Sequence, residues 1–129
     1  MSPIHKTEPL IDTKNLETAL ARFADERDWN RFHSAKNLAM ALTGEVGELV
    51  ELFQWSTEEQ SNQLGQDETT GRAVRDELAD VLLYLVRLAT ILKVDLNEAV
   101  QDKLARNAIK YPISIVGSGR SALPLPHKK

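Results

Sequence analysis

Four carboxylates in two short motifs are the residues of this chain that are best suited to chemistry. Glu45 and Glu48 lie three residues apart, and so do Glu77 and Asp80. Side chains three residues apart share one face of an α-helix, so each pair would project its carboxylates together. Mg²⁺ prefers oxygen ligands and usually binds carboxylates together with substrate phosphates. If the two segments pack antiparallel, we expect all four carboxylates to converge on one metal site.

The surroundings of Asp80 favour a metal ligand over an ordinary surface acid. A single acidic pair on a helix is usually a solvated face, but Asp80 lies within the apolar run 78–86. An ionised side chain in such a place is rarely tolerated without a partner. Arg87 is two turns further on, and we interpret it as facing nearly the opposite side of the helix. Metal binding is therefore the preferred explanation of Asp80.

Apolar periodicity and capping residues predict four main helices and no strand. Ser34 and Asp95 are the expected N-caps of the second and fourth helices, and Ser56 with Glu59 has capping-box spacing for a possible short helix. Gly44 and Gly47 each cost about 1 kcal/mol inside a helix, which predicts close packing or access to a ligand there. The expected helices span residues 14–27, 34–55, 71–93 and 95–111.

These elements predict an all-α, antiparallel helical bundle in one domain over residues 1–112, followed by an irregular or disordered tail over 113–129. The chain has 129 residues, no cysteine and a net charge of −3. Thiolate metal sites and cysteine nucleophiles are therefore excluded, and a broad nucleic-acid surface is not expected. The longest apolar stretch, 78–92, is shorter than the roughly 20 residues of a membrane span. We expect a cytoplasmic protein.

Three stretches resemble a known family. They are LAMALTGEVGELVELFQW at 38–55, DELADVLLYLV at 76–86 and KLARNAIKYP at 103–112. Together they resemble the MazG-like all-α nucleotide pyrophosphohydrolases, and within them the dCTP pyrophosphatase group. The resemblance implies hydrolysis of a nucleoside triphosphate, dCTP or a modified dCTP, to monophosphate and pyrophosphate, which would clean the nucleotide pool. It also implies a homodimer or homotetramer whose subunits complete one another's active site.

The resemblance also implies roles for particular residues. Mg²⁺, or Mn²⁺ in its place, would be held by Glu45, Glu48, Glu77 and Asp80, and we expect Glu45 or Glu48 to accept the proton of the attacking water. Separately, Lys36 and Asn37 open the second helix, where an N-terminus can favour phosphate. The residues that the resemblance places around the base, sugar and phosphates are Trp29, Trp55, Tyr84, Lys103, Asn107 and Tyr111.

Two alternatives stay open at this point. The carboxylates could form salt bridges between subunits of a non-catalytic helical interaction module, or the same chemistry could act on another nucleotide such as dUTP. The three histidines, His5, His33 and His127, lack the spacing of metal ligands and are interpreted as incidental.

Overall fold

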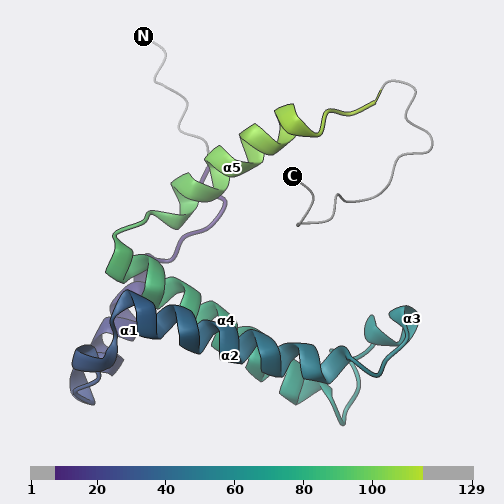
Figure 1. Ribbon diagram of the computed structural model, residues 1–129, viewed down its shortest axis with the longest axis horizontal. Coiled ribbons are helices and arrows are strands. Elements are labelled where there is room, and N and C mark those ends of the chain that lie inside the picture. Colours follow the sequence, from purple (N-terminus) through teal and green to yellow (C-terminus); the bar gives the residue numbers. More distant parts are fainter. Residues whose placement is uncertain (1–7, 115–129) are drawn as a thin grey trace.

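The structure is a computed structural model that describes residues 8–114, so His5, His127 and most of the predicted tail lie outside the described part. It confirms the all-α class, since residues 8–114 contain helices and no strand (Figure 1). The elements are α1 (Lys14–Glu26), the 3₁₀ turn η1 (Asn30–Phe32), α2 (Ala35–Phe53), α3 (Glu58–Ser61), α4 (Gly71–Leu92) and α5 (Leu96–Lys110).

Side-chain caps set the starts of the helices largely as the sequence predicts. The Ser34 hydroxyl accepts a hydrogen bond from the Asn37 backbone N–H, and Asp95 caps α5 in the same way. The capping box of α3 is shifted by one residue from its predicted place, because it is formed by Thr57 and Gln60. Such caps satisfy backbone N–H groups that have no partner inside the helix.

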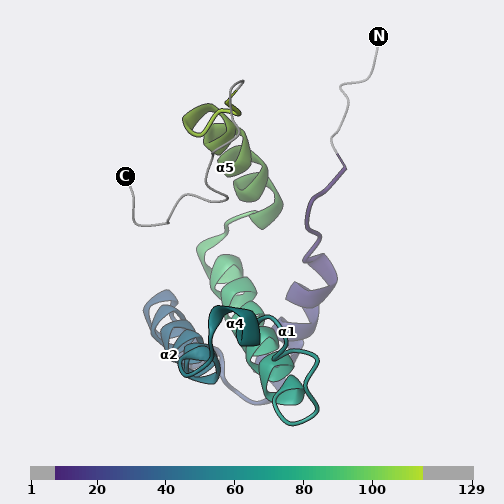
Figure 2. The ribbon, with the colours of Figure 1, turned by 90° about the vertical axis from the view of Figure 1, so that its right-hand side faces the viewer.

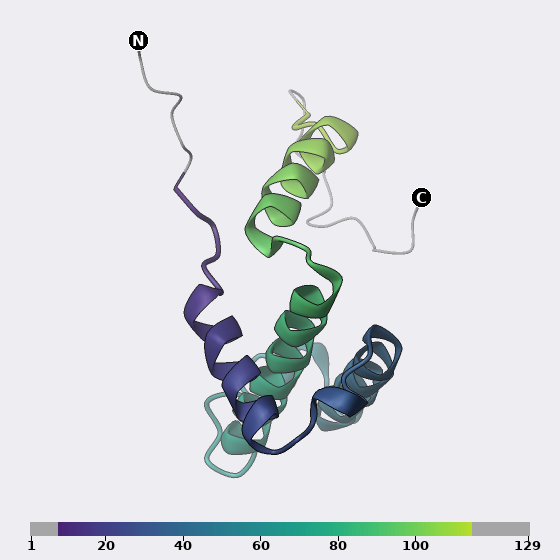
Figure 3. The same cartoon turned by 90° about the vertical axis from the view of Figure 1, so that its left-hand side faces the viewer.

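Helices α2 and α4 form a long antiparallel pair, and α1 packs on α4 from the other side. Figures 2 and 3 show α4 in the middle, with α1 and α2 on its two flanks. Among residues 8–114, the buried apolar side chains are few and come from these three helices: Ala24, Leu38, Val74, Val86 and Ala89. None of the described helices is long and apolar enough to cross a membrane.

Helix α5 projects away from this layer and does not join a four-helix core (Figure 3). Lys93 ends α4 in the left-handed conformation, with φ of 60°, and the chain then changes direction. The N-terminal end of α5 is held by Asn97, whose Oδ1 accepts hydrogen bonds from the backbone N–H groups of Leu10 and Ile11 at 2.8 and 3.3 Å. Within one chain, the packed layer therefore consists of α1, α2 and α4.

Candidate metal centre and adjoining cavity

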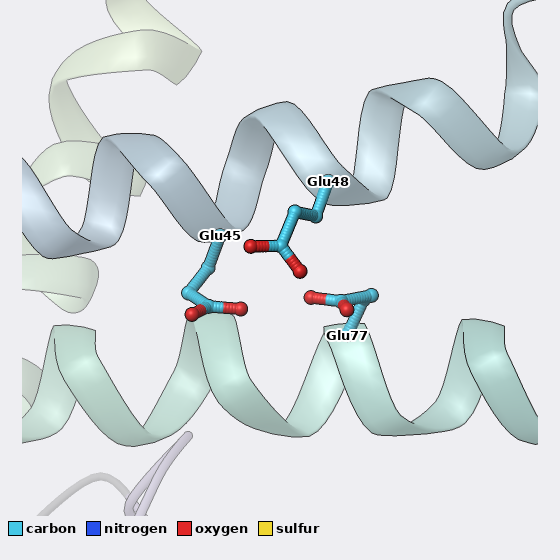
Figure 4. Close-up of side chains that lie close together, drawn as sticks. All are labelled: Glu45, Glu48 and Glu77. Atoms are coloured by element: carbon cyan, nitrogen blue, oxygen red, sulfur yellow. The ribbon is translucent and has the colours of Figure 1, made fainter.

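Three of the predicted carboxylates meet between the two long helices. Glu45 and Glu48 extend from α2 toward Glu77 of α4, and each offers an oxygen that lies within 4.8 Å of the others (Figure 4). The i, i+3 spacing on α2 gives the first two side chains a common direction, and the antiparallel packing of α4 brings the third to them. The convergence that the two motifs predict is thus present for three of the four acids.

Glu77 is the most perturbed acid of this group. Loss of hydration raises its pKa most, and the adjacent Glu45 carboxyl group and the negative charge of Glu48 raise it further, to about 7. One of its oxygens, Oε1, is buried and has no hydrogen-bond partner among the described residues. Buried polar atoms of native proteins nearly always have a partner, so an orphaned carboxylate oxygen facing two further carboxylates fits a site for a cation.

The donor set is chemically suited to a hard divalent ion. Carboxylate oxygens are the ligands that Mg²⁺ and Mn²⁺ take, and no nitrogen or sulfur ligand from the described part of the chain joins the group. Glu48 is exposed and Glu45 is half-buried, so the site is open to solvent and to a substrate on one side. Mg²⁺ usually keeps several waters and binds substrate phosphates as well, and an open site permits both.

Asp80 does not belong to the group of three. It is half-buried one turn beyond Glu77 on α4, and it lines a neighbouring cavity of about 630 Å³. That volume lies within the range of about 300–1,000 Å³ found for small-molecule sites. Asp80 therefore stands where the carboxylate group and the cavity adjoin, and a ligand in the cavity would meet it on the way to Glu77.

The cavity is formed by residues from α1, η1, α2 and α4. Three residues predicted to bind substrate line it, namely Trp29, Asn37 and Tyr84. The Trp29 ring lies edge-on to Phe23, with ring centroids 5.5 Å apart, and Phe23 also lines the cavity. Aromatic and apolar walls with a few polar groups are typical of sites for small-molecule ligands.

Two residues that line the cavity were not predicted as site residues from the sequence, Arg87 and His33. Arg87 was expected on nearly the opposite side of the helix from Asp80, which is wrong, since both line the same cavity. Seven residues advance an α-helix by almost two whole turns, so the two side chains share a face. His33, interpreted as incidental, accepts a hydrogen bond from Arg87 Nε to its Nδ1 at 3.1 Å. Arg87 is the single charged residue of the apolar stretch 81–92, and this was the sequence signal for the pair.

The other predicted substrate residues lie apart from the cavity in a single chain. Trp55 is 89% exposed beyond the C-terminal end of α2, and Lys36 is exposed in the first turn of α2. The remaining three belong to the segment that projects from the packed layer: Lys103 and Asn107 lie on α5, and Tyr111 directly follows this helix. Within one chain, the structure does not bring these five residues to the carboxylates.

Comparisons with known proteins give relatives over most of the chain. A family model described as the MazG-like family matches residues 41–116. dCTP pyrophosphatase 1 of Homo sapiens is 47% identical over 121 residues, covering 93% of this chain and 70% of the human protein. The Bos taurus protein of the same name is 42% identical over 122 residues, covering 94% and 71%. A solved pyrophosphatase from Archaeoglobus fulgidus DSM 4304 superposes with a TM-score of 0.72 at 34% identity, covering 84% of this chain and 98% of that one.

Proposed function

The chain belongs to the MazG-like family, and we propose that it is a divalent-metal-dependent nucleoside triphosphate pyrophosphohydrolase acting on dCTP or a modified dCTP. The relatives named dCTP pyrophosphatase 1 support the reaction and the base. The structural observation that carries the proposal is the meeting of Glu45, Glu48 and Glu77 within 4.8 Å beside a cavity of nucleoside size. One domain over residues 1–112 and a cytoplasmic location stay predictions.

Glu45, Glu48 and Glu77 would hold the ion. Asp80, which lines the adjoining cavity, is the proposed fourth ligand. Mg²⁺ is the proposed ion and Mn²⁺ the alternative, because both favour oxygen ligands. When bound, such an ion neutralises phosphate charge and acidifies water. Glu45 and Glu48 raise the pKa of Glu77, so the three carboxylates repel one another when no cation is present. A bound metal ion would remove this repulsion.

The proposed reaction is a direct displacement by water. A water oxygen attacks the α-phosphorus, the bond from the α-phosphorus to the bridging oxygen breaks, and pyrophosphate leaves. Glu48 or Glu45 accepts the proton that the water loses. The exposed position of Glu48 allows this carboxylate to return the proton to solvent. The nucleoside would occupy the adjoining cavity against Trp29 and Tyr84.

A second copy of the chain would complete the site. Large apolar side chains are exposed on α2, α4 and α5, among them Met40 at 65%, Leu78 at 53% and Ile109 at 81%. Exposed apolar surface of this extent is typical of a surface that another chain covers. We propose a homodimer or homotetramer in which Lys103 and Asn107 of α5, and Tyr111 directly after it, reach the phosphates bound to a neighbouring subunit.

A product assay tests the function. The protein is incubated with Mg²⁺ or Mn²⁺ and a panel of canonical and C5-modified triphosphates, and monophosphate and pyrophosphate are quantified. We expect both products in equal amounts from a cytosine nucleotide, and none from Glu48→Gln, while Glu59→Gln on α3 serves as the matched surface control. No turnover with any triphosphate would favour the non-catalytic interaction module. Preferred turnover of dUTP would support the proposed hydrolysis but contradict the proposed preference for a cytosine base.

A further inference from the structure

The cavity contains a buried cation that the proposed chemistry does not use. Arg87 is only 8% exposed on α4, and its guanidinium forms no ion pair within residues 8–114. Its hydrogen-bond partners are neutral, because Nη2 donates to Asn30 Oδ1 at 2.8 Å and Nε donates to His33 Nδ1 at 3.1 Å. Burying an arginine without a counter-charge is unfavourable, so an unpaired one in a cavity wall indicates a role toward a ligand.

Arg87 lies at the end of the cavity where the base of a bound nucleotide would be placed. Asp80, Tyr84 and Arg87 line the cavity from one face of α4, and Asp80 is one turn from Glu77. At about 1.5 Å per residue, Arg87 lies roughly 10 Å along the helix axis from Asp80. With the triphosphate at the carboxylates, a nucleoside of ordinary length places its base toward Arg87. This step rests on the proposed function.

Arg87 and His33 both present hydrogen-bond donors at this end of the cavity. Arginine has donors only. His33 accepts from Arg87 at Nδ1, so its neutral ring carries its proton on Nε2 and donates there. Burial and, after it, the charge of Arg87 lower the pKa of His33, which keeps the ring neutral. The Asn30 Oδ1 atom already accepts a hydrogen bond from Arg87 Nη2.

We infer that Arg87 and His33 are the specificity-determining residues for the base, and that they donate hydrogen bonds to the adjacent O2 and N3 acceptors of cytosine. Uracil and thymine carry a hydrogen on N3, so one of the two donors would face another donor. A site built around hydrogen bonds discriminates strongly against a ligand that leaves a buried group unpaired. We therefore expect a preference for cytosine of at least about tenfold.

A purely structural role for Arg87 makes a different prediction. Arg87 also ties η1 to α4, and Asn37 Nδ2 adds a second tie by donating to the Phe32 carbonyl at 2.9 Å. If Arg87 acted only by holding η1 in place, its loss would weaken the binding of all nucleotides alike. If it recognises the base, its loss removes the difference between cytosine and uracil.

The test is calorimetric binding of dCMP and dUMP with Mg²⁺ present. The wild type is expected to bind dCMP at least about tenfold more tightly than dUMP, and Arg87→Met to reduce this ratio to about one to three. His33→Asn keeps an acceptor close to the position of Nδ1 for Arg87 but deletes the Nε2 donor, so it should lower the ratio even if Arg87→Met fails to fold. Arg72→Met, exposed on the same helix, is the matched control and should keep the wild-type ratio.

The outcomes separate this inference from the proposed function. An unchanged ratio in His33→Asn and in folded Arg87→Met, or a wild type without cytosine preference, would overturn the inference even if the protein hydrolyses dCTP. A wild type that turns over no triphosphate but binds dCMP through Arg87 would retain the inference and refute the function.

Discussion

Lowering the pH from about 8 to about 6 should weaken Mg²⁺ binding to the nucleotide-free protein about tenfold, because Glu77 must lose its proton to bind a cation. The surroundings of Glu77 raise its pKa to about 7. A group with this pKa is about nine-tenths ionised at the higher pH and about one-tenth ionised at the lower. The apparent affinity follows the ionised fraction, which gives the tenfold change.

Isothermal titration calorimetry in buffers of different ionisation heat measures both the affinity and the protons released. We expect about 0.9 proton released per ion at the lower pH and about 0.1 at the higher. Glu77→Gln should lose most Mg²⁺ binding at both pH values, whereas Glu59→Gln should behave as the wild type. An affinity that is equal at the two pH values, with no proton release, would refute the assignment of Glu77 as a ligand.

The same pKa shift has a consequence for stability without metal. The folded state holds the Glu77 proton more tightly than the unfolded state, in which the pKa is near 4.5. The free energy of unfolding of the metal-free protein should therefore fall as the pH rises from 4.5 toward about 7. Glu77→Gln should remove this part of the pH dependence in urea titrations, and an unchanged slope would contradict the raised pKa.

The remaining predictions concern four other residues. Glu48→Gln and Asp80→Asn should each abolish turnover while the helical circular dichroism spectrum persists, and full activity in either would contradict the proposed site. Gly44→Ala should stabilise the protein by about 1 kcal/mol in urea unfolding, since a methyl group there meets no atom of the described segment within 4 Å; destabilisation would indicate that a partner subunit packs on it. Because burial and then Arg87 lower the pKa of His33 below 6.5, the free energy of unfolding should fall as the pH drops below 6.5, and His33→Asn should flatten this dependence.

Local rules made much of the fold predictable. Ser34 and Asp95 mark helix starts because their side-chain oxygens accept backbone N–H groups that would otherwise lack partners. The acidic motifs predicted a meeting of carboxylates because i, i+3 spacing and antiparallel packing bring side chains together. Glu45, Glu48 and Glu77 do meet, since these effects involve only two neighbouring helices.

Other features depend on packing that local patterns do not encode. The direction of α5 follows from the left-handed Lys93 and from Asn97 bonding a distant segment, and neither is visible as periodicity. The expected packing at Gly44 is absent within residues 8–114. Arg87 follows Asp80 by seven residues, almost two helical turns, so helix geometry puts both side chains on one face. The partners of Arg87, His33 and Asn30, lie more than fifty residues away in sequence.

Anomalous X-ray diffraction from crystals soaked in Mn²⁺ would locate the bound metal. We expect a manganese peak between α2 and α4, bonded to oxygens of Glu45, Glu48 and Glu77, and its loss in Glu77→Gln crystals. A wild-type crystal in which these carboxylates bond only to water or to one another, with manganese elsewhere or absent, would contradict the proposed metal site.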